Sequence, residues 1–421
     1  MTSIKKLYNQ FLTDPLYQNS IFMMASTFIM AIFGFVFWLI VARTFPIKAV
    51  GVATALISLM TLIGNFTGLG LNIGLIRYLP NSKVQNNLIN STFVLVSITT
   101  ILITGIFLIG LKIISPQLIF LQSTFFYIVS FIIYMIGYTI NNLVEGTFMA
   151  YRGAKNILIK NMFVGISKLI LPVFLFSFGA YGIFSSVTMA TIVGILVSLI
   201  ILIYRYKYRP AIIFNVKIIR EIAFFSVGNF IADFLFQSSA LLLSLLILNQ
   251  LDAKATAYYY IDAMIMNLLI IIPLATSQSL LAESSINEEL LKEHFLKAVK
   301  IVSLLLIPAI TIIYFFGNII LSFFGKTFQS DAFQLLQIMA LSVIFISITY
   351  LCSSYFRIRH QIYTLISMNL LGSILVILLS LLFVSHGLIG VGWGWFLGQA
   401  ITAVLYLLLL IKKLYQSKLI I

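Results

Sequence analysis

The chain has 421 residues, of which 61% are hydrophobic and only 9% are charged, and its formal net charge is +15. Because an average soluble domain carries about 25% charged residues, this composition excludes an ordinary soluble protein and indicates a membrane protein. A large positive charge can also indicate nucleic-acid binding. Here, however, the cations are distributed between apolar segments along the whole chain, so no nucleic-acid partner is expected.

Twelve apolar segments, separated by short loops, follow one another along the sequence. A transmembrane helix needs about 20 apolar residues, and each segment approaches or exceeds that length. We therefore expect an all-α polytopic membrane protein with about twelve transmembrane helices. They are predicted at residues 21–42, 49–76, 84–111, 118–144, 156–177, 181–204, 222–249, 255–282, 299–316, 332–356, 361–384 and 388–411.

Lysine and arginine residues are distributed unequally between the two sides of these spans. Twenty of the 26, Lys160 and Arg357 among them, lie in or beside the loops on one side, five lie on the other, and Lys168 falls inside the fifth span. Cytoplasmic loops of membrane proteins carry an excess of Lys and Arg. The pattern therefore predicts that both termini and the basic loop 205–220 are cytoplasmic in a multi-pass protein of the cell membrane.

The loop 205–220 lies between the sixth and seventh spans and predicts a division into two six-helix lobes, residues 1–204 and 221–421. A weak internal similarity between residues 48–54 and 254–260 favours a parallel duplication, with chance likeness between apolar helices as the alternative. Two lobes of this kind suit a transporter that works by alternating access around a central cavity.

Several features argue against an enzyme or a metalloprotein. The single cysteine, Cys352, allows no disulfide framework or cysteine-based metal site, and the three histidines fall in separate loops. The sequence also lacks the glycine-rich phosphate-binding motif of ATPases. No catalytic residue, metal or cofactor is therefore expected.

Motifs in both halves resemble a known family of transporters. The motifs are FVFWLIVAR at 35–43, VGVATA at 50–55, GLGLNIGLIRYLP at 68–80, AYYY at 257–260 and FGKTF at 324–328, the last followed by AFQLL at 332–336. In this order they are similar to the polysaccharide transporters of the multidrug/oligosaccharidyl-lipid/polysaccharide (MOP) flippase superfamily, which include the O-antigen and capsule repeat-unit flippases. Unlike the fourteen-helix members, this chain ends after the twelfth predicted span.

The resemblance implies a two-lobed fold like that of MATE transporters and a flippase that moves a polyprenyl-diphosphate oligosaccharide to the outer leaflet. It also implies contacts with membrane lipids, a possible H⁺ or Na⁺ coupling ion, and a polysaccharide polymerase as a possible partner. One alternative is a multidrug or organic-cation antiporter of the same superfamily. A second alternative, a membrane polymerase or ligase, would be expected to have a large outer catalytic loop, which this sequence lacks.

Three charged residues lie deep within predicted spans, where a charge costs about 2.5–3.5 kcal/mol on insertion scales. Lys168 is a candidate for binding the substrate diphosphate, and Asp233 and Asp262 are candidates for ion coupling. The structural alternative is an internal pair of Lys168 with Asp233, or a carboxylate bonded to Asn229 or Gln237. Asn229 is also a candidate for substrate binding.

Further candidates lie near the ends of spans. Arg43, Arg77 and Arg152 can contact a substrate phosphate, although arginines at helix ends often only reach lipid head groups. Tyr258 and Tyr259 can stack on sugars or form part of an interfacial aromatic belt. Separately, Glu145 is expected to pair with a nearby arginine such as Arg152. The complete candidate set is Lys168, Arg43, Arg77, Arg152, Tyr258, Tyr259 and Asn229 for the substrate, and Asp233 and Asp262 for the ion.

Overall fold

The computed structural model describes residues 15–286, 290–359 and 361–418. In these ranges the chain forms α-helices joined by short loops and 3-10 turns, and it contains no strand. A helix satisfies its backbone N–H and C=O groups within one segment, which is what hydrocarbon demands of a spanning chain. The predicted all-α membrane fold is confirmed.

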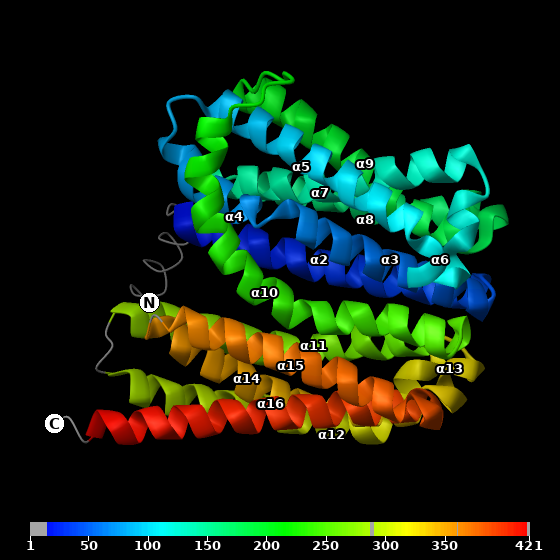
Figure 1. Cartoon of the computed structure of the whole chain (residues 1–421), viewed down its shortest axis with the longest axis vertical. Coiled ribbons are helices and arrows are strands. Elements are labelled where there is room, and N and C mark those ends of the chain that lie inside the picture. Colours follow the sequence, from blue (N-terminus) through cyan, green and yellow to red (C-terminus); the bar gives the residue numbers. More distant parts are fainter. Residues whose placement is uncertain (1–14, 287–289, 360, 419–421) are drawn as a thin grey trace, which may run out of the picture. The chain divides into compact units, whose positions relative to one another are not determined.

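Each predicted span corresponds to one long helix (Figure 1). Ten hydrophobic segments in the described ranges have the length and composition of a membrane span, and the last of them, Ile362–Lys413, contains two helices, α15 and α16. The other long helix, α10, includes the shorter apolar segment Phe234–Gln250. The twelve are α2 (Pro15–Thr44), α3 (Ile47–Gly68), α5 (Gln85–Ile109), α7 (Phe125–Ala150), α8 (Ala154–Phe174), α9 (Gly179–Tyr206), α10 (Val216–Gln250), α11 (Ala253–Ile286), α12 (Leu291–Ser322), α14 (Phe333–Ile358), α15 (Ile362–Phe383) and α16 (Gly387–Lys418).

The prediction of one uninterrupted helix over residues 49–76 was wrong. Helix α3 ends at Gly68, and a short helix, α4 (Leu71–Tyr78), follows it. Between them Leu69 and Gly70 have φ values of 50° and 66°, in the left-handed region that glycine adopts without a steric penalty. Two successive left-handed residues cannot continue a right-handed helix, so the apolar segment is broken here.

The predicted span 118–144 also differs from the structure. Residues Pro116–Gln122 form a 3-10 segment, and α7 begins only at Phe125, after Thr124 in extended conformation. The apolar side chains of Leu118 and Leu121 are nevertheless fully buried. These two leucines therefore pack at the end of the bundle and are not part of a membrane span. Composition alone does not distinguish the two cases.

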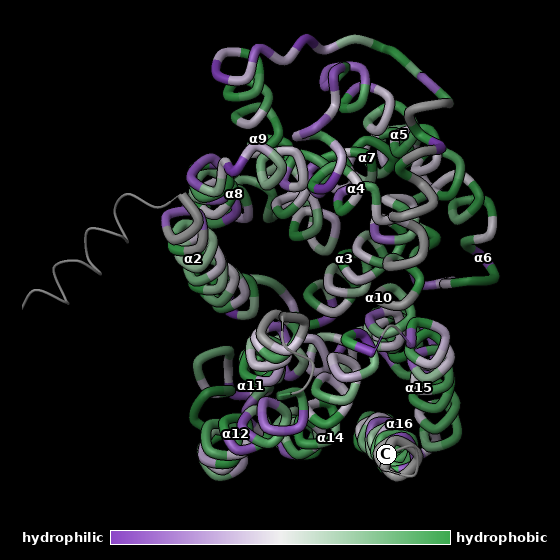
Figure 2. The backbone as a smooth tube through the Cα atoms, turned by 90° about the vertical axis from the view of Figure 1, so that its left-hand side faces the viewer, coloured by the Kyte–Doolittle hydropathy of each residue, from purple (hydrophilic) through white to green (hydrophobic). Residues whose placement is uncertain are grey.

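Contacts divide the chain into two compact units, residues 1–230 and 231–421. In the first unit α2 packs on α8, α8 on α9, and α5 on α7. In the second unit α11 packs on α14, and α16 packs on both α14 and α15. Residues 205–220 and the first part of α10 belong to the first unit by these contacts. Hydrophobic residues predominate along the helices, and hydrophilic ones gather at their ends and connections (Figure 2).

The segment after α9 is fixed to the first unit by side chains of α5. Asn90 accepts the backbone N–H of Ala211 at 3.3 Å and donates to the carbonyl of Arg209 at 3.0 Å. Ser91 accepts the N–H of Asn215 at 3.0 Å. These side chains therefore hold the non-helical backbone against α5, although most residues of the segment are exposed.

Small residues allow helices of the first unit to approach closely. A Cβ atom placed on Gly146 of α7 would lie only 2.7 Å from the backbone carbonyl oxygen of Asn72 in α4. Glycine at such a position lets two backbones meet, which is the usual role of small residues between membrane helices. Gly105 of α5, by contrast, has no neighbour within 4 Å of such an atom.

We predict that Gly146→Val destabilises the protein and that Gly105→Val does not. Overpacking costs about 1–3 kcal/mol where side chains can adjust, and the backbone of Asn72 adjusts less readily than a side chain. The measurement is the apparent Tm of both variants in detergent, followed by size-exclusion chromatography after heating. Equal Tm values for the two variants would contradict the close contact between α4 and α7.

Candidate functional site

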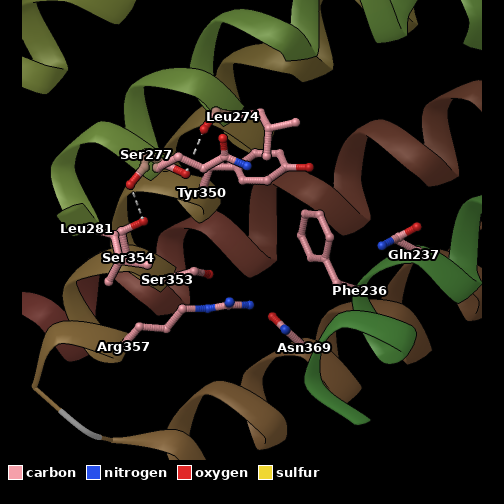
Figure 3. A pocket seen from close by; sticks show the side chains of 11 residues that line it. Phe236, Gln237, Leu274, Ser277, Leu281, Tyr350, Ser353, Ser354, Arg357 and Asn369 are labelled. Carbon is pink, nitrogen blue, oxygen red and sulfur yellow. Dashed lines mark hydrogen bonds between the residues drawn. The ribbon is translucent and has the colours of Figure 1, made fainter. Parts of the chain in front are cut away.

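A polar cavity of about 240 Å³ lies within the second unit, between helices α10, α11, α14 and α15 (Figure 3). Such polar lining is costly in a membrane-spanning bundle unless it faces water or a ligand. The lining includes one guanidinium group, three amides and three serine hydroxyls: Arg357, Gln237, Gln278, Asn369, Ser277, Ser353 and Ser354.

The cavity lies near the end of the unit at which α14 ends and α15 begins. Arg357 is in the last turn of α14. Asn369 lies seven residues after the start of α15 at Ile362, which corresponds to about 10 Å along the helix. In Figure 3 the Arg357 side chain extends in the direction of Asn369, and the ring of Phe236 stands above them. Arg357 therefore starts from the helix end nearest this part of the cavity, and its side chain extends towards the amide of Asn369.

Hydrogen bonds hold the polar walls of this cavity. The hydroxyl of Tyr406 donates to Asn369 Oδ1 at 2.7 Å, and Ser353 Oγ donates to the Tyr406 hydroxyl at 3.4 Å. Ser354 Oγ donates to the carbonyl of Ser277 at 2.9 Å and thereby joins α14 to α11. A side chain fixed in this way loses less conformational entropy when a ligand binds.

Aromatic rings complete the lining. Phe236 of α10 and Tyr350 of α14 have ring centroids 5.1 Å apart, with planes at 71°. This edge-to-face arrangement is one of the preferred geometries of aromatic pairs. The cavity therefore offers one cation, several hydrogen-bonding groups and an apolar surface within a single space.

The candidates predicted from the sequence do not include this site, although the sequence carries a signal for it. Ser353 and Ser354 follow Tyr350 by three and four residues, and Arg357 follows them by four and three, so all four lie on one face of α14. A polar stripe of this kind in an apolar span indicates a face turned away from lipid. Arg357 had instead been assigned only to the cytoplasmic loops.

A buried ion pair occupies the first unit. The ammonium group of Lys160 in α8 is paired with Glu145 of α7 and donates to Asn141 Oδ1 at 2.8 Å. The Lys160 side chain is only 1% exposed, whereas Glu145 is 34% exposed. Two expectations are thereby corrected. Lys160 is not a loop cation, because it lies two turns inside α8, and Glu145 pairs with it rather than with Arg152.

Lys168 lies in α8 and faces α2. Its Nζ atom is 4.5 Å from the ring centroid of Phe37, a cation–π contact of a kind worth about 0.5–2 kcal/mol. In the described part of the chain this lysine makes no ion pair or hydrogen bond. It lies six residues before the end of α8 at Phe174, or about 9 Å. Its role in binding substrate stays a prediction.

Of the two acidic candidates, the structure describes the side chain of Asp262 but not that of Asp233. Asp262 of α11 is fully buried, and neither carboxylate oxygen has a hydrogen-bond partner among the described residues. Asp233 and Asn229 lie in α10, but the structure does not describe their side chains. The suggested pair of Lys168 with Asp233 therefore stays a prediction. By helix register Asp233 shares a face of α10 with Gln237, four residues later.

The three arginine candidates lie at helix ends, as the sequence predicted. Arg43 is in the last turn of α2 and Arg77 in the last turn of α4. Arg77 lies over the ring of Tyr78, with 5.6 Å from its Cζ to the ring centroid. Arg152 follows α7 in a turn, with a φ of 53°. None of the three lines the cavity of the second unit.

The tyrosine candidates have partners within the second unit. The hydroxyl of Tyr258 donates to Asp331 Oδ2 at 2.9 Å, and that of Tyr259 donates to the carbonyl of Ala240 at 2.9 Å. Each residue is only 4% exposed. In this conformation both rings are therefore part of the packing of α11, and they offer no open face to a sugar.

Asp331 ends the short helix α13 (Lys326–Asp331) and joins it to the start of α11. Lys254 Nζ lies 2.9 Å from Asp331 Oδ2, and Ser330 Oγ donates to Oδ1 at 2.7 Å. Hydrogen bonds from Ser330, Lys254 and Tyr258 lower the pKa of Asp331 from 3.8 to about 2. The carboxylate therefore stays ionised and keeps α13 attached to α11.

For the buried ion pair we predict that Lys160→Met lowers stability strongly, because Glu145 then keeps an uncompensated charge. Removing one partner of a buried pair costs about 3–5 kcal/mol, and the partial exposure of Glu145 favours the lower end. The double variant Lys160→Met with Glu145→Leu should recover most of the loss. Lys155→Met, at an exposed position of the same helix, is the control. A Tm of the Lys160→Met variant equal to that of the control would refute the pair.

For Asp331 we predict a stability contribution that depends on pH. Because its folded-state pKa is depressed, the contribution is fully present above the ordinary value of 3.8 and is lost as the pH falls towards 2. The measurement is the difference in Tm between the wild type and Asp331→Asn from pH 6 down to pH 2. The difference should shrink across the lower part of this range, and a constant difference would show that the ionised carboxylate does not contribute.

Comparisons with known proteins agree with this architecture. Residues 16–272, more than half of the chain, match the family described as polysaccharide biosynthesis protein. No curated protein shows significant sequence similarity to the chain.

Solved structures share the fold at low sequence identity. The lipid II flippase MurJ in an inward closed conformation has a TM-score of 0.75 and 17% identity, over 93% of this chain and 87% of that chain. An inward-facing multidrug resistance MATE family transporter of the MOP superfamily has a TM-score of 0.72 and 15% identity, over 94% and 99% of the two chains. MATE in complex with MaL6 has a TM-score of 0.62 and 15% identity, over 96% of both chains.

The long helices match the predicted spans, the neighbouring structures share this architecture, and the family match covers most of the first unit and the start of the second. The protein is thus a multi-pass membrane protein that belongs to the polysaccharide biosynthesis protein family, with the fold of the MOP superfamily.

Proposed function

We propose that this protein flips a lipid-linked oligosaccharide, a polyprenyl-diphosphate repeat unit, from the cytoplasmic to the outer leaflet for surface polysaccharide biosynthesis. The observation that carries the proposal is the polar cavity around Arg357, found inside a membrane protein of a polysaccharide biosynthesis family. The MurJ neighbour, whose structure is that of a lipid II flippase, supports the same substrate class.

The chemistry of the described interior suits such a substrate. A diphosphate needs cations, and Arg357 at the cavity and Lys168 in α8 are two that the described interior contains. Sugar hydroxyl groups need donors and acceptors, which the amides and serine hydroxyls of the cavity supply. A polyprenyl chain needs no polar contact at all, because it remains in the hydrocarbon of the bilayer.

A multidrug or organic-cation antiporter is the second candidate, and the MATE neighbours favour it by fold. A cationic substrate would be repelled by Arg357 in the cavity of the second unit. In the first unit the charge of Glu145 is already neutralised by Lys160. Asp262 gives this alternative its strongest support, because a buried carboxylate without a described partner can attract a cation.

A polymerase or ligase acting on the same lipid-linked sugars is a third possibility. Such an enzyme needs a loop large enough to hold catalytic groups outside the bilayer. The connections between the described helices are short, such as Phe45 and Pro46 between α2 and α3, and Leu251 and Asp252 between α10 and α11. Transport without a chemical step therefore remains the better proposal, with a polymerase as a possible partner.

Energy for the movement is proposed to come from an ion gradient, with H⁺ or Na⁺ as the coupling ion. Asp262 is a candidate because its burial without a hydrogen bond disfavours an ionised carboxylate that has no bound cation. Asp233 is a second candidate through its position on the same face of α10 as Gln237. Both assignments are proposals that rest on position and not on an observed ion.

We predict that a strain lacking this gene still makes the lipid-linked repeat unit but does not display the corresponding surface glycan. Without a flippase the intermediate has no route to the outer leaflet, so it accumulates on the cytoplasmic side. Lipid extraction with mass spectrometry measures the intermediate, and surface staining measures the glycan. Normal surface glycan together with a lost resistance to cationic drugs would favour the antiporter instead.

We also predict that both termini are cytoplasmic, from the excess of Lys and Arg on one side of the spans. A reporter that is active only in the cytoplasm should work when fused after Ile421 and fail when fused after Gly179, at the start of α9. A reporter active only outside should give the reverse pattern. Outside activity at Ile421 would overturn this orientation.

A further inference from the structure

We propose that the connection between α9 and α10 is a membrane-surface anchor that binds anionic phospholipids of the cytoplasmic leaflet. The anchor consists of residues 207–216 together with Lys83, which precedes α5. Its cations contact the lipid headgroups, and the side chains of Ile212 and Phe214 lie at the edge of the hydrocarbon. This inference goes beyond the proposed function, because it concerns the lipid around the protein and not the molecule that is moved.

The connection starts from a fixed point on the first unit. Helix α9 ends at Tyr206, and Lys207 has a φ of 55°, a left-handed conformation that ends a right-handed helix. The next side chain, Tyr208, is only 4% exposed, and its hydroxyl donates to Asn90 of α5. The chain is thereby directed along α5, beside the ends of α5 and α9 in Figure 1.

Hydrogen bonds to α5 show the direction in which the connection then runs. The N–H of Arg209 donates to Asn86, in the first turn of α5, at 3.2 Å. Further on, the N–H of Asn215 donates to Ser91 at 3.0 Å. Ser91 follows Asn86 by five residues, or about 7.5 Å along the helix. The later part of the connection therefore lies deeper in the bundle than the earlier part.

The deeper part of the connection exposes large apolar side chains. Ile212 is 95% exposed, Val216 64% and Phe214 50%, whereas Ile213 and Asn215 between them are partly buried. A contiguous group of exposed apolar side chains marks a surface that contacts a membrane or a partner molecule. The connection therefore has an occupant along this surface, and its surroundings decide which one.

The bilayer extends to the level of this surface. Leu196, Ile200 and Tyr204 of α9 are 55%, 56% and 77% exposed, and their spacing of four residues places them on one face of the helix. In a multi-pass membrane protein such an apolar face contacts lipid, and this one continues into the last turn of α9. Helix α5 has 25 residues, or about 37 Å, against about 30 Å of hydrocarbon. Its ends therefore lie among the headgroups.

The cations lie at the shallower end of the connection. Lys207, Arg209 and Lys83 are exposed, and Lys83 is three residues before Asn86, the partner of Arg209. Residues 205–221 contain five cations and one acid, Glu221, and residues 78–90 contain no acid. A basic cluster of this kind is attracted to the anionic lipids of the cytoplasmic leaflet.

The order of charge and hydrophobicity favours lipid over a soluble polyanion. A segment that lies in the membrane interface has cations at the headgroups and apolar side chains that enter the acyl region. A bound RNA or acidic protein would contact Lys207 and Arg209 but would leave Ile212 and Phe214 in water. An anionic lipid surface contacts both groups at once.

Site-specific fluorescence quenching tests the anchor on the full-length protein in lipid nanodiscs. Cys352 is fully buried, and Cys352→Ala leaves one introduced cysteine to carry a fluorophore. The labelled variants are Ile212→Cys and Phe214→Cys, with Asn81→Cys as the control, because Asn81 is exposed in the 3-10 turn before α5. The quencher is attached near the top of the acyl chain of either phosphatidylglycerol, which is anionic, or phosphatidylcholine, which has no net charge.

We expect the probes at Ile212 and Phe214 to be quenched more strongly than the probe at Asn81, and more strongly by phosphatidylglycerol than by phosphatidylcholine. A cation at an anionic membrane surface strengthens binding about fivefold. Adding Lys207→Gln and Arg209→Gln to the Ile212→Cys variant should therefore lower the preference for phosphatidylglycerol about fivefold for each cation. Lys112→Gln removes an exposed cation of α6 (Leu111–Ile114) and should leave the preference unchanged.

Several results would overturn the anchor, provided that the Tm of each variant shows a folded protein. Quenching at Ile212 and Phe214 no stronger than at Asn81 would show that the connection does not enter the bilayer. Equal quenching by the two lipids, or a preference that survives the loss of both cations, would refute the binding of anionic lipid. A probe that responds to added RNA but to neither lipid would assign the surface to nucleic acid instead. The experiment needs no transport substrate, so its result does not depend on the proposed function.

Discussion

The structure depends on one requirement, that polar groups inside a bilayer find hydrogen-bond partners within the protein. The backbone meets it by forming helices over nearly all of the described chain. Many hydroxyl side chains meet it locally. Thr92 and Thr188, for example, donate to carbonyls three and four residues earlier in their own helices. Such residues add polarity to the sequence without creating a site.

Other polar groups bond between helices or line a cavity. In the first unit, Thr100 donates to Thr67 at 3.0 Å and lies 3.3 Å from the Thr139 hydroxyl, which ties α3, α5 and α7 together. The pair of Lys160 with Glu145 ties α7 to α8. In the second unit the polar groups around Arg357 instead surround a space. This contrast makes the second unit the better place for a ligand.

Sequence alone predicted the helices well because a spanning helix has a strong signal, a long apolar segment between charged loops. It failed where apolar residues serve packing at the end of a bundle, as at Leu118 and Leu121, and where backbone geometry breaks a span, as at Leu69 and Gly70. Hydrophobicity reports burial, and it does not report whether the surroundings are lipid or protein. The amino-acid composition gives no indication that Leu69 has a positive φ.

The candidate site was less predictable, for a related reason. A cation close to a helix end is read as a loop charge, so Lys160 and Arg357 were assigned to topology, whereas the structure buries one and places the other at a cavity. Tyr258 and Tyr259 look available for sugars in the sequence, but their hydroxyls are bonded within the second unit. The depth of a side chain and the groups it contacts depend on how neighbouring helices pack. The sequences of twelve apolar helices do not show which of them are neighbours.

The central claim is that this protein carries a lipid-linked oligosaccharide. Native mass spectrometry of the full-length protein, purified gently from its own membranes, tests it most directly by identifying the bound molecules. We expect a polyprenyl-diphosphate oligosaccharide among them, released when the protein is unfolded. Phospholipids alone, or a bound organic cation, would contradict it.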